Sequence, residues 1–203
     1  MNTSPFPSPE QRRADRAAKR HAVLAAAVAM FNERGFHATS LDDVAASLGI
    51  SKPTIYHYLG NKDQVLLECL TMGLQQLIAA ADAAHATPGR GLDRLQAFLR
   101  RYAEVNMDAF GACVIRTPEE ALSLDSADRL RAMKREIDAA MRGLIAEGMA
   151  DGSIAPADPT LLAFTLAGAL NWPARWYDPA GRFDAPDVAA QMVDILTAGI
   201  APS

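Results

Sequence analysis

The chain has 203 residues, of which 50% are hydrophobic and 22% are charged, and this composition excludes a wholly disordered protein. The formal net charge of −4 excludes a protein covered in basic charge, but the charge is unevenly distributed. Residues 1–63 carry a net charge of +2, from 8 Lys and Arg against 6 Asp and Glu, whereas residues 64–203 carry −6, from 12 against 18. This asymmetry suits contact with phosphate groups at the N-terminal end only.

The cysteines and the apolar segments indicate in which cellular compartment the protein is expected to act. Cys69 and Cys113 lack the spacing of a metal site, so we expect free, buried thiols and neither a metal nor a cofactor. No apolar run approaches the roughly 20 residues of a membrane-spanning helix, so we expect no membrane partner. The stretch 22–31 follows Lys19 and Arg20 as in a secretory signal, but it begins late and charged residues follow it. A cytoplasmic protein is therefore predicted.

The first third of the chain divides into a tail and a long helix. Residues 1–9 contain three prolines and two serines and are predicted to be a disordered tail. Residues 10–33 are predicted to form a helix, because their apolar residues recur at helical spacing: Val23, Leu24, Ala27, Val28 and Phe31. Gly35 is expected to end this helix. Basic residues crowd its first half: Arg12, Arg13, Arg16, Lys19 and Arg20.

Two short helices and then a second long helix are predicted next. Ser40 is a good N-cap for a helix with an apolar face from Leu41 to Leu48, and Gly49 ends that helix. Ser51 caps a second short helix that runs to about residue 59. An Asn–Gln capping pair at positions 61 and 64 then begins a long helix over residues 62–84.

The remainder continues to show helical periodicity. A linker at 85–91 precedes five further helices, which begin near residues 92, 117, 130, 158 and 184. No segment shows sustained period-two alternation, so we predict an all-α fold of about nine helices. We place a tail at 1–9, a helix-turn-helix domain at 10–61 and a second helical domain at 62–203.

Residues 41–59 meet the physical demands of a helix-turn-helix. The point where its two helices cross needs a small residue, and Ala45 is small. The turn between the helices needs a residue that tolerates positive φ, and Gly49 is a glycine. In such a motif the second helix enters the major groove of DNA, so its outward positions should be polar or aromatic. These positions hold Lys52, Thr54, Tyr56, His57 and Tyr58.

The run from Gly35 to Lys62, GFHATSLDDVAASLGISKPTIYHYLGNK, closely resembles the N-terminal signature of the TetR family of transcriptional regulators. The resemblance covers roughly residues 15–68, and beyond them only the architecture is similar. Leu59 stands where many relatives carry Phe, and Pro53 replaces a frequent small residue. The resemblance implies a DNA-binding regulator, nucleoid-associated when bound, and not an enzyme. No Gly-rich phosphate loop, nucleophile elbow or metal triad argues otherwise.

The resemblance also implies residue roles. Thr39 and Ser40 would bind phosphate through their hydroxyl and backbone N–H groups, and Lys62 would be a phosphate clamp. In the major groove Lys52 would donate to guanine, with contacts from Ser51, Pro53, Thr54, Tyr56 and His57. Two interpretations of the basic cluster at residues 12–20 remain open: a solvated helix face, or an arm that contacts DNA.

A homodimer is expected, because paired recognition helices match a palindromic operator in double-stranded DNA. In the family the last two helices form the dimer interface, and the small residues here would permit close approach: Ala163, Ala167, Gly168, Ala169, Ala189, Ala190 and Gly199.

The second domain would bind a small-molecule effector. A stripe of Met and aromatic residues is usually plain core, but in this architecture part of it should line a pocket for an apolar or amphipathic ligand. The candidates are Phe98, Tyr102, Phe110, Cys113, Met133, Ile137, Met141, Phe164 and Trp172. The aromatic insert at 171–183 is similar to that of members thought to sense acyl-CoA thioesters. Arg116, Arg175 or Arg182 would then meet phosphate or form surface ion pairs.

We therefore predict a repressor that a small effector, such as an acyl-CoA or a fatty acid, releases from a palindromic operator. An activator or a ligand-insensitive regulator is the alternative, because the position of the operator decides the sign of regulation.

Overall fold

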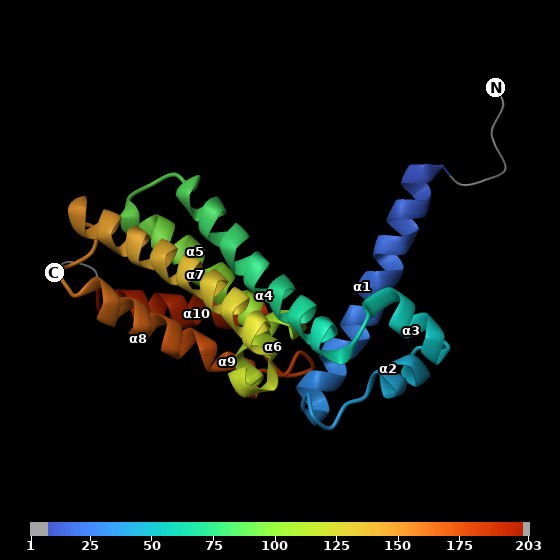
Figure 1. Cartoon of the computed structure of the whole chain (residues 1–203). Coiled ribbons are helices and arrows are strands. Elements are labelled where there is room, and N and C mark those ends of the chain that lie inside the picture. Colours follow the sequence, from blue (N-terminus) through green and yellow to red (C-terminus); the bar gives the residue numbers. More distant parts are fainter. Residues whose placement is uncertain (1–7, 201–203) are drawn as a thin grey trace. The chain divides into compact units, whose positions relative to one another are not determined.

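The computed structural model describes residues 8–200, and within them it contains α-helices and one 3-10 turn but no strand. This confirms the all-α prediction. The helices, shown in Figure 1, are α1 Pro9–Arg34, α2 Leu41–Ser47, α3 Lys52–Leu59, α4 Lys62–His85, α5 Gly91–Met107, α6 Ala109–Arg116, α7 Leu124–Ala150, α8 Pro159–Asn171, α9 Pro173–Trp176 and α10 Ala185–Ala198.

The chain divides into two compact units. The first ends at Cys69 and the second begins at Leu70, so the division lies inside α4. Within the first unit, α1 begins earlier than expected. The hydroxyl of Ser8 accepts a bond from the N–H of Gln11 at 3.1 Å and the Ser8 N–H donates to the Gln11 side chain at 2.7 Å. Ser8 and Pro9 therefore belong to the helix start, and the rest of the predicted tail, 1–7, lies outside the described residues.

The first unit is held by a small apolar core between α1, α2, α3 and the start of α4. Gly49 has a φ of +64°, which confirms that it makes the turn between α2 and α3. Arg20 of α1 donates to both carboxylate oxygens of Glu68 and to the backbone carbonyl of Tyr58. Leu48 was expected in the core but is 37% exposed. The fully or nearly buried side chains include Leu24, Val28, Val44, Ile55, Val65 and Cys69.

The second unit is built around α5, which contacts α6, α7, α8, α9 and α10. The start of α5 lies against the end of α7 so closely that a Cβ on Gly91 would lie 2.3 Å from the backbone of Gly148. Cys113 is buried in this unit and Cys69 in the first, both as free thiols, as predicted.

Two helices of the second unit were not expected, and one expected helix is only a turn. The eight residues of α6 are almost all apolar, so they lack the polar face that makes a helix visible in a sequence. Four-residue α9 is too short for any period. Near residue 117 only the 3-10 turn Glu119–Ala121 forms, and α7 then begins at Leu124.

The prediction about membrane-spanning length needs correction. Among the described residues, α4, with 24 residues, is long and apolar enough to cross a membrane. Half of its apolar stretch is buried inside the protein, as in the core helix of a soluble protein. Packing therefore accounts for the buried half of this stretch.

Candidate nucleic-acid interface and candidate ligand cavity

The second helix of the helix-turn-helix, α3, buries one face and exposes the other. Ile55 and Leu59 are buried in the core of the first unit. Lys52, Pro53 and the neighbouring Tyr56 and His57 are exposed, with Tyr56 at 50%. The exposed residues include most of those expected to meet DNA bases, and a polar and aromatic helix face of this kind can enter a major groove.

Thr39 does not fit its expected role as a phosphate ligand. Its side chain is 2% exposed, and its hydroxyl donates to the backbone carbonyls of Gly35 at 3.0 Å and Met30 at 3.3 Å. Its backbone N–H donates to Phe36. These bonds satisfy Thr39 internally and fix the loop before α2, so the prediction for this residue is wrong.

Ser40 is equally occupied by local bonds. Its hydroxyl donates to Asp43 at 2.6 Å and accepts from the Asp43 backbone N–H at 3.1 Å, which forms the N-cap of α2. Hydrogen bonds from the side chain and backbone of Ser40 lower the pKa of Asp43. A carboxylate therefore occupies the positive end of this helix. Ser40 is exposed, and its contact with phosphate stays a prediction.

The polar residues at the start of α3 are linked to one another. The Lys52 ammonium lies 2.5 Å from Asp42 of α2, and this bond raises the pKa of the lysine. The hydroxyls of Ser51 and Thr54 are 2.8 Å apart. Because these side chains are exposed or half-buried, they remain at the surface that α3 presents.

Lys62 and Tyr56 come together in a surface groove of about 400 Å³, although they lie on different helices. The Lys62 ammonium lies 4.2 Å from the centre of the Phe36 ring and 3.5 Å from the His37 carbonyl oxygen. Burial lowers the pKa of Lys62. The groove thus holds a positioned cation beside an exposed aromatic ring, an arrangement suited to an anionic group.

The first turns of α1 carry an exposed basic face. Arg12, Arg16 and Lys19, together with the acidic Asp15, border a hollow of about 270 Å³ with His57 and Tyr58 of α3. Arg20, in contrast, is committed to its bonds with Glu68 and the Tyr58 carbonyl. Both interpretations of the basic cluster therefore stay open for the residues before Arg20: a solvated helix face, or an arm that contacts DNA.

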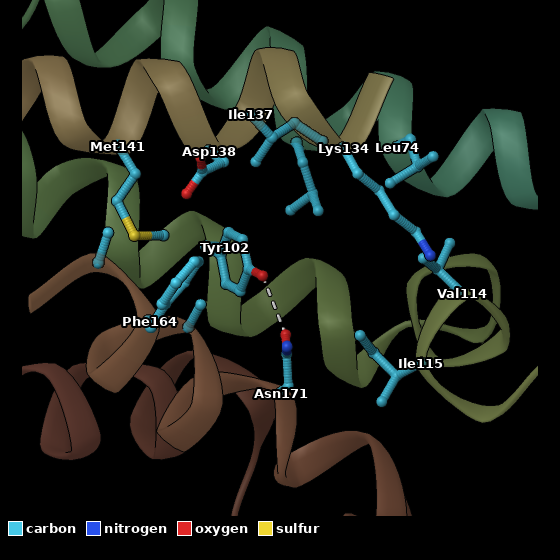
Figure 2. A pocket seen from close by; sticks show the side chains of 13 residues that line it. Leu74, Tyr102, Val114, Ile115, Lys134, Ile137, Asp138, Met141, Phe164 and Asn171 are labelled. Carbon is cyan, nitrogen blue, oxygen red and sulfur yellow. Dashed lines mark hydrogen bonds between the residues drawn. The ribbon is translucent and has the colours of Figure 1, made fainter. Parts of the chain in front are cut away.

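A cavity of about 280 Å³ opens in the second unit, between α4, α5, α6, α7 and α8 (Figure 2). Four of the predicted ligand-binding residues line it: Tyr102, Ile137, Met141 and Phe164. The sequence reasoning missed the other lining residues: Leu74, Leu77, Val114, Ile115, Lys134, Asp138, Ala163, Ala167 and Asn171. No period marked these residues, because a cavity forms where several helices leave space between them.

The other five predicted ligand residues do not line this cavity. Phe98, Phe110 and Cys113 are buried, so they are part of the packed core. Burial raises the pKa of the Cys113 thiol. Met133 is half-buried outside the cavity, and Trp172 is 64% exposed at the surface because it follows the end of α8. The Met and aromatic pattern that suggested these five residues therefore does not mark the wall of this cavity.

One end of the cavity is polar. The Tyr102 hydroxyl donates to Oδ1 of Asn171 at 2.9 Å, as Figure 2 shows. Asn106 also contacts Asn171, because its Nδ2 donates to the same oxygen at 3.0 Å. Burial raises the pKa of Tyr102, so its hydroxyl stays protonated and remains a donor at neutral pH.

The three arginines considered for phosphate contact lie elsewhere. Arg116 donates to the backbone carbonyl of Ala174 at 2.6 Å, and Arg175 donates to that of Ile115 at 3.1 Å. The Arg182 guanidinium lies 5.1 Å from the centre of the Phe183 ring. None of these three side chains lines the cavity. Arg116 and Arg175 connect α6 with α9, and Arg182 stacks on Phe183.

Comparison with known proteins extends over both units. Residues 23–69 match the family described as bacterial regulatory proteins, tetR family, and residues 88–200 match a tetracyclin repressor-like C-terminal domain. The second match alone spans more than half of the chain. The protein belongs to the TetR family.

Individual TetR-family relatives cover almost the whole chain. The HTH-type transcriptional repressor KstR2 of Mycolicibacterium smegmatis is 28% identical over 190 residues, which are 92% of this chain and 93% of that protein. A TetR/AcrR regulator from Thermobifida fusca YX-ER1 is 34% identical, with a TM-score of 0.67, over 90% of this chain and 98% of that one. AibR, solved with isovaleryl coenzyme A and operator DNA, shares the fold: 24% identity and a TM-score of 0.75 over 87% of this chain and 96% of AibR.

Membership of the TetR family makes this chain a DNA-binding transcriptional regulator and not an enzyme. TetR-family regulators bind operator DNA and a small-molecule effector and act as dimers.

The TetR-type second unit also exposes apolar side chains on α8 and α10. Leu161, Phe164 and Ile195 are 67%, 61% and 75% exposed. A Cβ on Gly168 or Gly199 would meet nothing within 4 Å, so space lies open beside both glycines. Of the small residues expected at a dimer interface, Ala163 and Ala189 are instead buried in the protomer's own core.

Proposed function

We propose that this regulator is a homodimeric repressor that binds a palindromic operator through its first unit and releases it when an effector enters the cavity of the second. The predicted domains at 10–61 and 62–203 then correspond to DNA binding and to effector binding with dimerisation. The KstR2 relative, similar along almost its whole length, is named as a repressor. We further propose that the protein acts in the cytoplasm.

The observation that carries this proposal is the surface formed by α3 and the start of α4. Lys52, Pro53, Tyr56 and His57 are exposed on a helix that a glycine turn holds against α2. We assign base contacts to Lys52, Pro53 and Thr54, with Ser51 beside them, and phosphate or base-edge contacts to Tyr56 and His57. Lys62 supplies the phosphate clamp.

The effector is expected to be mostly apolar, because most residues that line the cavity are apolar. A volume of about 280 Å³ lies just below the range of roughly 300–1,000 Å³ for ligand pockets, so it suits an acyl chain or a small ring system better than a whole coenzyme A thioester. AibR, which has the same fold, was crystallised with such a thioester. A fatty acid or the acyl part of an acyl-CoA is therefore our candidate.

Release is expected to work through α4. This helix carries Lys62 in the first unit and Leu74 and Leu77 in the cavity wall of the second. An effector that binds more tightly to one setting of α4 shifts the population toward that setting. If the two DNA-binding units of a dimer then no longer match adjacent major grooves, the operator is released.

Binding to DNA fragments selected from the genome, beginning with the DNA beside the protein's own gene, tests the proposal. We expect a specific complex in a gel shift at stated salt concentration, weakened at least tenfold in Lys62→Ala and Tyr56→Ala. Arg135→Ala, which removes an exposed cation from α7, should bind as the wild type does. No specific complex with any fragment would overturn the proposal.

An activator, or a regulator that ignores ligands, is the alternative. Transcription in vitro from a promoter that carries the selected operator separates these from a repressor. A repressor lowers transcript yield, and acyl-CoAs or fatty acids restore it. An activator raises the yield, and a ligand-insensitive protein gives the same yield with and without these compounds.

A further inference from the structure

The polar end of the cavity presents hydrogen-bond donors in a fixed orientation. The first fixed group is Asn106, which is fully buried. Its Nδ2 donates to the backbone carbonyl of Leu170 at 3.2 Å. A carbonyl can only accept, so the amide of Asn106 cannot be reversed without placing two oxygens against each other. Its Nδ2 therefore points toward α8.

The same amide orients the next side chain. The Nδ2 group of Asn106 also donates to Oδ1 of Asn171, so Asn171 must present its oxygen to Asn106. The Tyr102 hydroxyl donates to this oxygen as well. Both bonds use the acceptor oxygen of Asn171 and leave its Nδ2 group without a hydrogen-bond partner among residues 8–200. Asn171 lines the cavity, so this amide is a donor for whatever fills it.

The Tyr102 hydroxyl hydrogen is not available to a ligand. It is engaged by Asn171. Elsewhere in the wall, Lys134 supplies further donors, and Asp138, which forms an ion pair with Arg142, supplies a carboxylate. At the Asn171 end, the donor that remains for a ligand is therefore the Nδ2 group of Asn171.

We propose that the effector carries an acceptor oxygen, as a carbonyl or a carboxylate, that binds the Nδ2 group of Asn171, while its apolar remainder packs against Ile137, Met141 and Phe164. This inference rests on the proposal that the cavity is the effector site. A pure hydrocarbon cannot form this bond, so we expect it to bind less tightly than a compound that carries the acceptor oxygen.

A pair of probes that differ only in the acceptor tests the inference. 2-Hexanone has a carbonyl oxygen, and 2-methyl-1-hexene replaces that oxygen with a methylene group. We expect the wild-type protein to bind the ketone at least about threefold more tightly, which is the value of one ordinary hydrogen bond. In ¹⁵N–¹H spectra of Asn-labelled protein, the ketone should shift the side-chain amide signal of Asn171, and the alkene should not shift it comparably.

The variants separate recognition from packing. In Asn171→Asp one carboxylate oxygen can still accept from Tyr102 and Asn106, while the other replaces the donor, so the preference for the ketone should be lost. Asn171→Leu, which cannot regain a donor by taking up a proton, should give the same loss. Met141→Leu alters the apolar wall only and should change the affinity for both probes alike.

Equal affinity of the wild type for ketone and alkene, no binding of either, or an unchanged preference in both Asn171 variants would overturn the inference. Operator binding by the same preparations, measured by fluorescence anisotropy without any probe, is independent of these results. A protein that binds DNA but shows no ketone preference would refute the role of Asn171 and leave the proposed regulator intact.

Discussion

Asp151, which caps the end of α7, is held by donors from two parts of the second unit. Its carboxylate accepts the backbone N–H of Gly91 at 2.7 Å and that of Ser153 at 2.9 Å. Hydrogen bonds to Ser153 and then to Gly91 lower the pKa of Asp151 from 3.8 to about 2. The charged carboxylate therefore joins the start of α5 to the turn after α7.

The pH dependence of this contact has a definite sign. Because the folded protein has the lower pKa, the carboxylate contributes stability fully above pH 3.8 and loses it as the pH falls toward about 2. We expect Asp151→Asn to lower the denaturant midpoint at neutral pH, and the difference from the wild type to shrink over that acidic interval. An Asp151 carboxyl signal that titrates near 3.8 in the folded protein would contradict the expectation.

Lys52 and Asp42 give a second prediction at the scale of single residues. The carboxylate of Asp42 holds the lysine and would itself repel DNA phosphate. Asp42→Asn should strengthen DNA binding and steepen its salt dependence, whereas Lys52→Ala should weaken it and lower the slope of log K against log salt by about 1 if the lysine neutralises a phosphate. Fluorescence anisotropy across a salt series measures both.

The control for these variants is Asp82→Asn, which removes an exposed carboxylate from α4 in the second unit. It should leave the salt slope unchanged. If Asp42→Asn behaves like this control, Asp42 does not lie near the bound DNA.

At the scale of single residues, the sequence predicted local backbone features better than the contacts that individual side chains make. The residues around Gly49 were predictable because a turn imposes its own local demands. The internal bonds of Thr39 and Ser40 were not, because a hydroxyl at a helix start serves a cap as readily as a phosphate. The role of Asn171 was also hidden, since it depends on two partners from another helix.

At the scale of elements, helix starts were predictable because capping is local. Asn61 and Gln64 exchange the expected bonds at the start of α4. Asp158 and Asp184 accept backbone N–H groups at the starts of α8 and α10. The helix contacts were less visible, because Gly91 and Gly148 look like ordinary helix-weakening glycines until the packing of α5 on α7 is known.

This contact predicts unequal effects of two Gly→Ala changes. Gly91→Ala places a Cβ 2.3 Å from the Gly148 backbone, which cannot move aside like a flexible side chain, so we expect a destabilisation of about 1–3 kcal/mol or more. Gly143→Ala, within α7, meets nothing within 4 Å and should stabilise the protein by about 0.5–1 kcal/mol through helix propensity. Chemical denaturation gives both values. Similar effects of the two changes would contradict the close approach.

At the scale of the whole molecule, the fold class was predictable and the cavity was not. Nearly continuous helical periodicity and the signature of the first unit defined an all-helical TetR-type protein. A cavity depends on which apolar side chains fail to fill the space between five helices. The sequence therefore named Tyr102 and Met141 together with Phe98 and Cys113, and it could not separate the wall from the core.

The exposed apolar residues of α8 and α10 give the last prediction. A Cβ on Gly168 or Gly199 would meet nothing within 4 Å, and Ile195 is 75% exposed, so a monomer would leave this surface uncovered in water. A second copy of the chain is the expected cover, since TetR-family regulators act as dimers. Ile195→Asp should shift the protein from dimer to monomer in light scattering, because it places a charge in an apolar interface.

DNA binding should follow the oligomeric state. A monomer engages one half-site at a time, so the Ile195→Asp variant should lose about 100-fold or more in affinity for a palindromic operator, yet bind an isolated half-site as the wild type does. Leu124→Asp is the matched control, because Leu124 is 81% exposed at the start of α7, away from α8 and α10 in the chain. If both variants remain dimeric, the interface lies elsewhere. If only Ile195→Asp dissociates, the surface of α8 and α10 couples the two DNA-binding units.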